Sequence, residues 1–321
     1  FSGGNDSIAA LYLSHPSAVG IFLQRSSHEN SIKSLYKDDA AVHSCDRVAD
    51  SGRNILKIKT SLEYLRNPIG FPVDWSNGVP AILNADLLNL GSLAYGMVLE
   101  SSYHVGHNKY SDLRLRPVYS NWSPLFDAVG IPICLPTAGL SEVVTSSIST
   151  IQVPEWEGQS CVRGLVGAPC MKCFKCFRKR LLDFENAAID IPDKHFDMPV
   201  SSKEVRRRLL ETPIHHENVM AFSMLNFESN HPLAMALHDK AKAFANKVGG
   251  LGFLRNFYTP AKVLIPEHIR LDTLARIANV AKNMSIHELK LVESWNLQPT
   301  IDDDEYKDAN KKISLILNDS N

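Results

Sequence analysis

The sequence predicts an α/β protein, in which a doubly wound parallel sheet is followed by a helical C-terminal appendage. Three observations support this fold class: a glycine loop at the start of the chain, short apolar runs that alternate with helix-like segments, and helix patterns without strand-like runs after about residue 190. Strands that alternate with helices form parallel sheets covered on both faces. We therefore expect an α/β domain over residues 1–185 and a helical domain over residues 190–321.

The composition fits a globular protein with a sizeable core. Of the 321 residues, 44% are hydrophobic and 21% are charged, and the formal net charge is −1. A balanced charge gives no global field that would draw the protein onto nucleic acid or an anionic membrane, although local basic patches leave a nucleic-acid partner open. The sequence contains no run of 18 or more apolar residues, so it predicts no membrane span. We therefore expect a cytoplasmic protein without a membrane partner.

Apolar periodicity places the elements of the first domain. Helices are expected over residues 7–14, 30–49, 80–100 and 141–150 and from residue 177, with 80–100 the clearest long helix. Strands are expected over residues 18–23, 54–59, 103–106 and 131–135. Ligands of such sheets bind at the carboxyl ends of the strands, where the glycine loop would lie.

The second domain is expected to be helical throughout. Helix patterns cover residues 202–211, 232–248, 269–282 and 286–295, and the tail over 302–321 is acidic and then amphipathic. Three prolines, at positions 192, 199 and 213, interrupt the helix patterns near the expected junction with the first domain. We expect these helices to offer a surface for a protein acceptor or partner, or for a homodimer.

The first seven residues contain the clearest chemical motif. Gly3 and Gly4 allow positive φ angles, so that main-chain amides can approach a phosphate, and the helix that follows adds its N-terminal dipole. The hydroxyls of Ser2 and Ser7 can donate to phosphate oxygens. Asp6 repels phosphate, so it would orient the loop or hold Mg²⁺. A surface turn with a capped helix is the alternative reading of the same string.

The position of this loop in the sequence leads to one more expectation. A phosphate loop of this kind normally follows a buried parallel strand. Only Phe1 precedes the loop in this sequence. We therefore expect an apolar strand upstream of Phe1.

Four of the six cysteines, Cys161, Cys170, Cys173 and Cys176, follow the spacing C-x8-C-x2-C-x2-C. Closely spaced thiols in a long, core-rich chain indicate a metal site rather than disulfides. Four thiolates close a tetrahedral Zn²⁺ site with no open position, so the site would be structural. An iron–sulfur cluster is the alternative, because four thiolates serve both. The two remaining cysteines are isolated and are expected to be buried.

The two motifs together resemble a known enzyme family. The string SGGNDS over residues 2–7 resembles the SGGxDS signature of the PP-loop ATP pyrophosphatase superfamily, which has an adenine nucleotide alpha hydrolase-like fold and cleaves ATP between the α and β phosphates. The cysteine spacing, followed by the basic run FRKR over residues 177–180, resembles 7-cyano-7-deazaguanine synthase. That family binds Zn²⁺ structurally and converts 7-carboxy-7-deazaguanine to a nitrile with ATP and ammonia, through an adenylated acid and an amide.

The resemblance covers residues 1–182 and assigns roles to the residues that match. It implies that ATP is bound by Ser2, Gly3, Gly4, Asn5, Asp6 and Ser7, that Asp6 and Ser7 are catalytic with Mg²⁺, and that Cys161, Cys170, Cys173 and Cys176 hold Zn²⁺. The expected substrate is a small deazapurine acid.

The chain departs from the synthase pattern at two places. The stretch VPAILN over residues 79–84 lacks an arginine that the family carries, and AGLSE over residues 138–142 lacks a lysine. Divergent relatives with an added helical domain occur in bacterial anti-phage operons, where the expected chemistry is attachment of the deazaguanine acid to an amine, including a protein amine. The sequence leaves open whether the product is a nitrile, an amide or a protein conjugate.

Four further residues are candidates for substrate binding. Asn84 and Asp86 open the long central helix, where capping is the alternative role. Lys109 and Asp112 follow a predicted strand, so they would lie at the ligand end of the sheet, with a polar loop as the alternative. The pair His215 and His216 shows no metal spacing and is expected to be surface or core.

Three functions follow from these observations. The first is ATP-dependent adenylation of a carboxylate on a 7-deazaguanine-type substrate, followed by attack of an amine or ammonia with release of AMP and pyrophosphate. The second is a tRNA-modifying PP-loop enzyme, which would use a basic surface such as residues 206–208. The third is a catalytically reduced nucleotide-binding subunit of a defence complex, which the missing arginine and lysine favour.

Overall fold

The computed structural model describes residues 1–25, 38–65, 74–227 and 229–319. The described chain is mostly helical, and its strands form two parallel pairs. Strand β1 (Val19–Arg25) pairs with β2 (Asn54–Thr60), and β3 (Leu93–Ala94) pairs with β4 (Ile133–Cys134). The parallel direction agrees with the predicted alternation of strands and helices. Each pair stands as a two-stranded sheet in the described residues, so the doubly wound sheet stays a prediction.

The first elements lie where the sequence predicts them. Helix α1 (Asn5–Leu13) follows the glycine loop, and the main-chain nitrogen of Phe1 donates to the carbonyl oxygen of Ile21 in β1 at 2.6 Å. Helix α2 (Asp39–Asp50) crosses from β1 to β2. It covers the second part of the helix expected over residues 30–49, and residues 30–37 lie outside the described residues.

The long helix predicted over residues 80–100 is wrong. The segment forms two short helices, α3 (Val79–Leu83) and α4 (Ala85–Leu88), then β3, and then α5 (Leu99–Tyr103). Asn89 adopts a left-handed φ of 47° and ends α4. Asparagine and glycine favour such turns over helix interiors, and they outweigh the apolar periodicity here.

The strand predicted over residues 103–106 is wrong as well. Tyr103 ends α5, and His104 and Gly106 take left-handed φ angles of 56° and 87°, which turn the chain away from an extended path. The strand predicted over 131–135 is confirmed in part, because β4 covers two of its residues. Helix α8 (Glu142–Ser147), continued by a wider turn over Ile148–Gln152, confirms the helix expected over 141–150. Helix α9 (Phe174–Ala187) confirms the basic helix and begins three residues earlier than expected.

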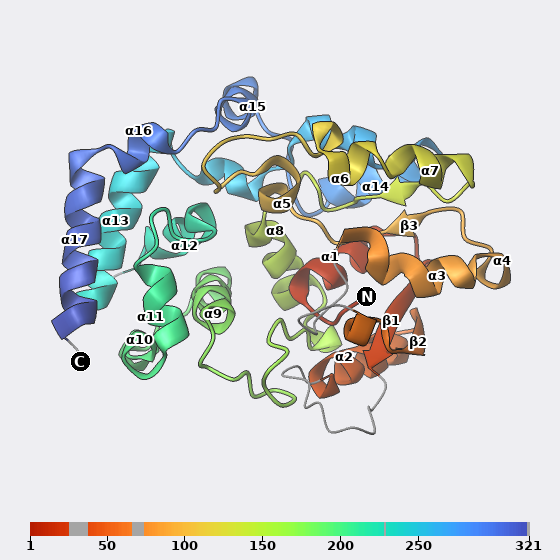
Figure 1. Ribbon diagram of the computed structural model, residues 1–321, viewed down its shortest axis with the longest axis horizontal. Helices are drawn as coiled ribbons and strands as arrows, with labels where there is room; N and C mark the ends of the chain where they lie inside the picture. The colour runs from red at the N-terminus through yellow and green to blue at the C-terminus, as the bar shows by residue number, and fades with distance from the viewer. Residues whose placement is uncertain (26–37, 66–73, 228, 320–321) are drawn as a thin grey trace.

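Helices dominate the later part of the chain, as predicted. The remaining helices are α6 (Pro117–Ser120), α7 (Ser123–Ala128), α10 (Met198–Ser201), α11 (Lys203–Leu209), α12 (Glu217–Met224), α13 (Pro232–Val248), α14 (Glu267–Ala278), α15 (Ile286–Glu293), α16 (Gln298–Ile301) and α17 (Asp304–Asp319). Helices α13 and α17 pack side by side at the end of the molecule opposite the N-terminus (Figure 1).

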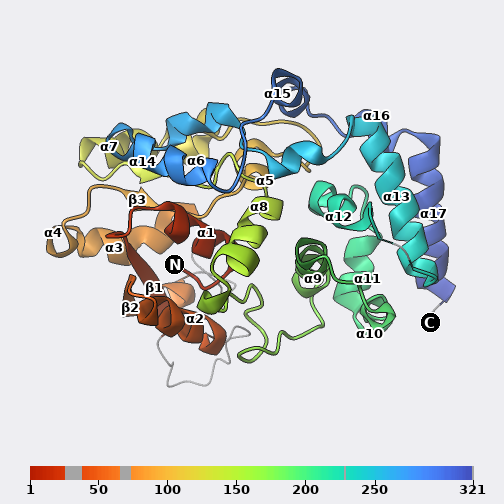
Figure 2. The same ribbon diagram turned by 180° about the vertical axis from the view of Figure 1, so that it is seen from behind.

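The later helices share a core with the first half of the chain. After α13 the chain returns toward the half that holds the N-terminus, and it does so in both views (Figures 1 and 2). The amide of Leu135 donates to the carbonyl of Leu264 at 2.9 Å, and the amide of Tyr258 donates to the carbonyl of Gly139 at 2.8 Å. The division near residues 185–190 stays a prediction, and these contacts cross it.

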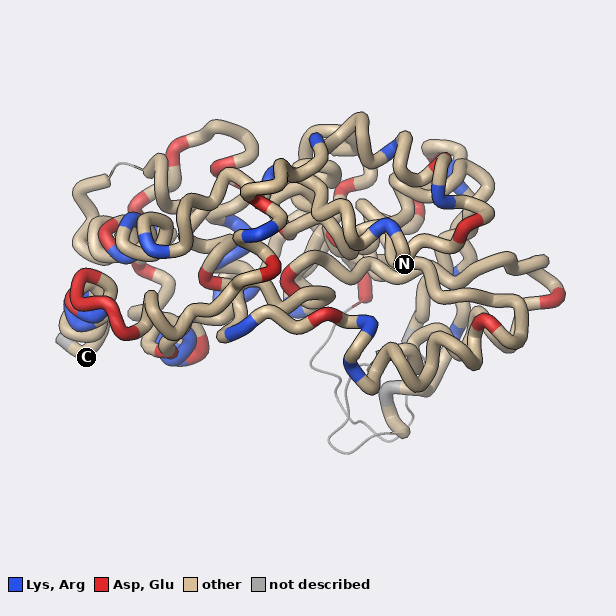
Figure 3. Tube along the Cα trace, turned by 90° about the horizontal axis from the view of Figure 1, so that it is seen from above, with Lys and Arg blue, Asp and Glu red and all other residues tan. Residues whose placement is uncertain are grey.

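Charged residues of both signs are interspersed along the trace (Figure 3), in line with the formal net charge of −1. Within the described residues, each helix is too short or too polar to cross a membrane.

Candidate functional site

The glycine loop lies at the N-terminal end of α1. The carbonyl oxygen of Gly4 accepts hydrogen bonds from the amides of Ser7 and Ile8, each at 3.0 Å, which starts the helix. Gly3 has a φ of 70°, and a Cβ atom there would lie 2.9 Å from Cα of Ala41 in α2. Both the left-handed backbone and the close approach therefore require glycine at position 3.

The polar groups of the loop suit an anion. Within the described residues, no hydrogen bond uses the main-chain amides of Gly3 and Gly4. The hydroxyls of Ser2 and Ser7 lie 3.1 Å apart, and Ser7 Oγ also donates to the carbonyl of Gly4 at 2.9 Å. Unused amides at the start of a nine-residue helix, together with two hydroxyls, are the groups that bind phosphate oxygens.

The two polar side chains between the glycines and Ser7 are both anchored by α8. Asn5 is buried, and its amide nitrogen donates to Ser146 Oγ at 3.1 Å. Asp6 is partly exposed, and its Oδ1 accepts from Thr145 Oγ1 at 2.7 Å. Asn5 therefore fastens the loop, while the carboxylate of Asp6 is oriented and keeps a face open to solvent.

A lysine from α9 completes this cluster. The Nζ atom of Lys179 lies 3.7 Å from Oδ1 of Asp6 and 2.9 Å from Oε2 of Glu142, and the lysine is only 5% exposed. Arg178 also pairs with both carboxylate oxygens of Glu142. Burial opposes charge on Lys179, but the carboxylates of Asp6 and Glu142 outweigh it and raise the lysine pKa.

Two buried glutamates, Glu142 and Glu100, are in contact with each other, and Glu142 is the one that pairs with Lys179. The amide of Glu142 donates to Oε2 of Glu100 at 3.1 Å, and Asn218 donates to Oε1 of Glu100 at 3.1 Å. Burial, and then the charge of Glu142, raise the pKa of Glu100 to about 8. Burial opposes ionisation of Glu142 too, but Arg178 and Lys179 hold its pKa well below the usual value. At neutral pH Glu100 is therefore protonated and Glu142 is charged.

The position of Lys179 bears on the departure from the synthase pattern. The stretch over residues 138–142 carries no lysine, but the buried ammonium of Lys179 reaches the first turn of α8 from the neighbouring helix. The basic run over residues 177–180 supports the family resemblance, but the sequence assigns no role to Lys179. The spacing of Lys179, three residues after the last cysteine, was the signal that could have linked it to the metal-bearing end of α9.

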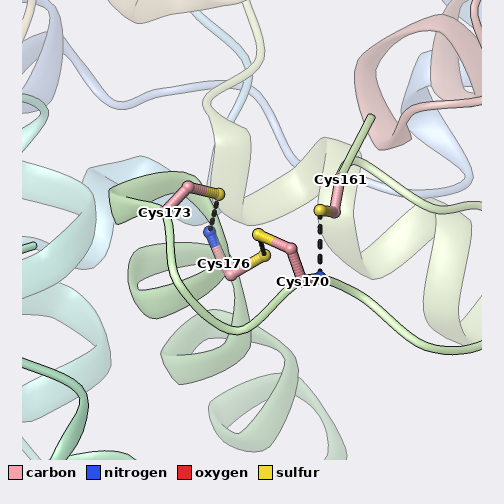
Figure 4. Close-up of side chains that lie close together, drawn as sticks. All are labelled: Cys161, Cys170, Cys173 and Cys176. Carbon is pink, nitrogen blue, oxygen red and sulfur yellow. Dashed lines mark hydrogen bonds between the residues drawn. The ribbon is translucent and has the colours of Figure 1, made fainter. Parts of the chain in front are cut away.

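The four predicted metal ligands come together (Figure 4). Their sulfur atoms all lie within 4.8 Å of one another, and the sulfurs of Cys170 and Cys176 are 3.7 Å apart. Zinc–sulfur bonds of about 2.3 Å in a tetrahedron place sulfur atoms about 3.8 Å apart. The cluster therefore fits a metal such as zinc with little rearrangement, and the described residues supply four thiols and leave no open position.

The local chain path explains how distant Cys161 joins the other three. A tight turn pairs Leu165 with Ala168, and a Cβ atom at Gly164 would lie 2.3 Å from the carbonyl oxygen of Ala168. The segment between Cys161 and Cys170 therefore folds back on itself. The amide of Cys170 then donates to the sulfur of Cys161 at 3.3 Å.

The metal cluster also starts α9. Cys173 is the N-cap residue, and its sulfur accepts from the amide of Cys176 at 3.4 Å. Hydrogen bonding by Cys176 lowers the pKa of Cys173 to about 5 against the opposing effect of burial. A helix N-terminus and main-chain amides favour thiolates, which are the form that binds metal. Helix α9, which places Lys179 beside Asp6, thus begins at the predicted metal ligand Cys173.

Within the described residues, none of the four candidate substrate residues makes a hydrogen bond or ion pair with the glycine loop. Asn84 Nδ2 donates to the carbonyl of Pro80 at 2.7 Å, and Asp86 is exposed in α4. Lys109 is exposed in a turn that pairs with Asn296. Asp112 is buried and accepts three hydrogen bonds from Arg114 side-chain nitrogens and one from its amide. Asn84 lies between α3 and α4 and makes no side-chain cap bond to α4, and the substrate roles of these four residues stay predictions.

Comparison with known proteins gives one match. The model of a family of unknown function (DUF6395) matches residues 121–296, which is more than half of the chain. No curated protein and no solved structure matches the chain. The matched range holds the four cysteines together with α8 and α9, and the chain therefore belongs to this family of unknown function.

Proposed function

We propose that the protein binds ATP at residues 2–7 and uses it to adenylate the carboxylate of a 7-deazaguanine-type acid. The observation that carries the proposal is the convergence of Asp6, Thr145 and Lys179 beside unused amides at the start of α1. This arrangement supplies donors for phosphate oxygens, one carboxylate with an open face for Mg²⁺, and one buried ammonium. The resemblance of the loop to the PP-loop signature and the cysteine spacing support the reaction class.

The proposed reaction has two steps. An oxygen of the substrate carboxylate attacks the α-phosphorus of ATP, the bond to the bridging oxygen breaks, and pyrophosphate leaves. An amine or ammonia then attacks the carbonyl carbon of the acyl adenylate, loses a proton, and expels AMP to leave an amide. In this scheme the loop amides and Lys179 would offset the charge that develops on phosphate oxygens, and Asp6 would hold Mg²⁺.

We also propose that the four thiolates hold Zn²⁺ and that its role is structural. A closed set of four sulfur ligands leaves no position for substrate. The bound metal would offset two of the four negative charges of the thiolates and fix the start of α9, which would keep Lys179 in reach of Asp6. The protein is proposed to work in the cytoplasm, with the later helices contacting the protein that supplies the amine.

The test measures AMP and pyrophosphate from ATP and Mg²⁺, with and without 7-carboxy-7-deazaguanine and an amine. We expect release of both products only when the acid is present. Asp6→Ala should lower the rate by about 100-fold or more while the thermal midpoint stays within a few degrees, because Asp6 is partly exposed. Asp127→Asn, at an exposed position in α7, is the control and should keep full activity.

A second variant tests the loop itself. At Gly4 a Cβ atom would lie 3.6 Å or more from its neighbours, and the φ of −90° suits any residue. Gly4→Asp places a carboxylate at the N-cap of α1, which preserves the helix and repels phosphate. We expect loss of ATP binding with an intact fold. ATP binding that survives Gly4→Asp would refute the loop as the site, and binding without AMP release in the unaltered protein would identify a nucleotide-binding subunit.

A further inference from the structure

Four histidines gather in a part of the molecule that the proposed reaction does not use. His104 and His107 lie in the turn after α5, and His215 and His216 lie in the turn before α12. The ring centroids of His104 and His107 are 4.9 Å apart, those of His107 and His215 are 6.0 Å apart, and those of His215 and His216 are 4.1 Å apart. Two turns more than 100 residues apart in sequence thus present their imidazoles to one another.

Both turns hold strained backbone. His104 and His216 have left-handed φ angles of 56° and 58°, and they are two of the six non-glycine residues with positive φ in the described ranges. Gly106 approaches the start of α12, just after the second turn, so closely that a Cβ atom would lie 2.0 Å from Oδ1 of Asn218. Trp295 further fixes the first turn by donating to the carbonyl of His107 at 2.9 Å. Strain of this kind persists where surrounding contacts fix the chain, and it is common at ligand sites.

A pocket of about 430 Å³ opens between the two turns. It is lined by His104, Gly106, His107, Asn108, Lys109, Glu211, Pro213, Ile214 and His215. Its lining includes the exposed ammonium of Lys109 and the side-chain amide of Asn108. Within the described residues, no hydrogen bond uses the main-chain amides of Gly106 and Asn108. The pocket is therefore rich in donors and large enough for a small molecule.

The charges around the pocket favour an anion. Arg116 lies behind His104 and donates to its Nε2 and to the carbonyls of Ser101 and Ser102. No carboxylate of the described residues lies within ion-pair distance of Arg116. The one acid in the lining, Glu211, is already paired with Arg207 at 2.8 Å and with Arg208 at 2.9 Å. The positive charges of the Arg116 guanidinium and the Lys109 ammonium are thus not balanced by a carboxylate of the described residues within ion-pair distance.

The imidazoles are neutral in the absence of a ligand. Burial, followed by the charge of Arg116, lowers the pKa of His104 to about 4, and burial followed by Arg178 lowers that of His216 to about 2. The pKa values of His107 and His215 are lowered for the same reasons. A neutral imidazole donates one N–H, and an entering anion would favour its protonation, so anion binding and proton uptake should be linked.

We propose that this histidine pocket binds the phosphate group, or an equivalent oxyanion, of a small molecule. The pocket differs from the glycine loop, because the Glu142 ion-pair cluster lies between them: Glu142 is 2.9 Å from Lys179 on one side and 3.6 Å from Nδ1 of His216 on the other. A divalent cation suits it less well, since the nearby guanidinium and ammonium groups repel it. Among the described residues, the converging metal-ligand group is that of the cysteines.

Sulfate is the probe for this pocket, because its charge is constant between pH 6 and pH 8. Binding is measured by calorimetry on the full zinc-loaded chain carrying Gly4→Asp, so that the glycine loop does not contribute. We expect sulfate to bind, and to bind at least fivefold more tightly at pH 6 than at pH 8. The charged and titratable groups that face the pocket histidines are Lys109, Arg116, Arg178, Arg208, Glu142 and Glu211.

The double variant His107→Gln with His215→Gln should weaken sulfate binding at least tenfold. Lys109→Ala, at an exposed rim position, should weaken it as well, which keeps the test valid if the double variant folds poorly. His268→Gln, an exposed histidine on α14, is the control and should bind sulfate normally. Binding that these variants leave unchanged, binding of equal strength at both pH values, or no binding would overturn the proposal.

A second zinc equivalent that disappears in the histidine variant would also overturn the proposal, because it would identify a metal site instead. Failure here is separate from failure of the proposed function, since the AMP assay does not depend on these histidines and the sulfate assay does not depend on the loop.

Discussion

Glu100 and Glu142 show how single residues set the electrostatics of the centre. Both are buried, and the two lie in contact through the amide of Glu142. Two neighbouring carboxylates cannot both ionise at low cost in a buried place, so the one with cationic partners keeps the charge. Arg178 and Lys179 face Glu142, whereas Glu100 is met by Asn218. The protonated Glu100 thus allows a charged Glu142 to hold Lys179 beside Asp6.

This arrangement predicts how stability depends on pH. The folded pKa of Glu100, about 8, lies above its ordinary value of 4.5. The folded state therefore binds the extra proton between these values, so its stability falls as pH rises from about 4.5 to about 8 and levels off above that. We expect the urea midpoint of the protein to drop between pH 7 and pH 9. Glu100→Gln should remove about 1.4 kcal/mol of this drop, because about one pH unit of the falling range lies between pH 7 and pH 8.

Glu293→Gln is the control for this measurement, since that glutamate is exposed on α15. A midpoint that rises between pH 7 and pH 9, or that falls equally in the Glu100 variant, would contradict the protonation of Glu100.

The residues that sequence could identify are those whose chemistry depends on local spacing. The glycine loop and the four cysteines are short strings in which glycine, serine or thiol must occur at fixed offsets, so the sequence alone is enough to predict them. Asp6 and Thr145 are 139 positions apart, and no local pattern links them. The same holds for Lys179 and for the histidine pocket, since burial and pairing at these residues arise only when α1, α5, α8, α9 and α12 pack together.

Helix α9 is the element that joins the metal cluster to the loop. Its N-cap is Cys173, its first turn holds Cys176, and its next turn holds Arg178 and Lys179, which pair with Glu142 on α8. Metal binding that fixes the first turn therefore also fixes the ion pairs one turn further along. In the proposed function, the four cysteines would therefore support the loop while lying outside the proposed reaction.

Loss of one metal ligand should therefore affect three quantities together. We expect Cys173→Ser to lower bound metal well below one equivalent, to reduce stability by about 3 kcal/mol or more, and to reduce ATP turnover. Metal content is measured by elemental analysis, and stability by denaturant unfolding. Cys45→Ser removes a buried cysteine away from the cluster and should leave the metal content intact. Full metal content in the Cys173 variant would refute the four-cysteine site.

Sequence patterns predicted the helices of the second half better than those between residues 80 and 106. Helix α13 repeats buried apolar residues at helical spacing, among them Leu233, Leu237 and Phe244, so periodicity alone identifies it. Between residues 80 and 106 the same periodicity is interrupted by Asn84, Asn89 and Gly96. Gly96 lies against the loop, where a Cβ atom would be 2.5 Å from the carbonyl oxygen of Asp6. A tertiary contact of this kind decides the local structure and is invisible in the sequence.

Over the whole molecule, the core is continuous across the expected domain boundary. Buried apolar residues from both halves form one connected cluster, which includes Leu140 and Phe177 from the first half and Phe244 and Trp295 from the second. Hydrogen bonds cross the boundary as well, for example from Ser141 Oγ to the carbonyl of Leu254 at 2.7 Å. The later helices thus complete the core of the first half.

A fragment that ends at residue 189 should therefore fail to fold by itself. Removing residues 190–321 exposes α8 and α9 on the face that now packs against α11, α12 and the segment after α13. We expect the fragment to lack cooperative thermal unfolding by circular dichroism, whereas the full chain unfolds in one transition. A fragment that unfolds cooperatively near the midpoint of the full chain would support two independent domains.

The central claim is that ATP activates a carboxylate by adenylation, and the fate of a carboxylate oxygen tests it most directly. In the proposed reaction the oxygen that attacks the α-phosphorus stays on the phosphate when the amine displaces AMP. The measurement uses 7-carboxy-7-deazaguanine labelled with ¹⁸O in its carboxylate, together with ATP, Mg²⁺ and an amine, and analyses AMP by mass spectrometry. The proposed reaction yields AMP that carries one ¹⁸O atom, and unlabelled AMP or the formation of ADP instead would rule it out.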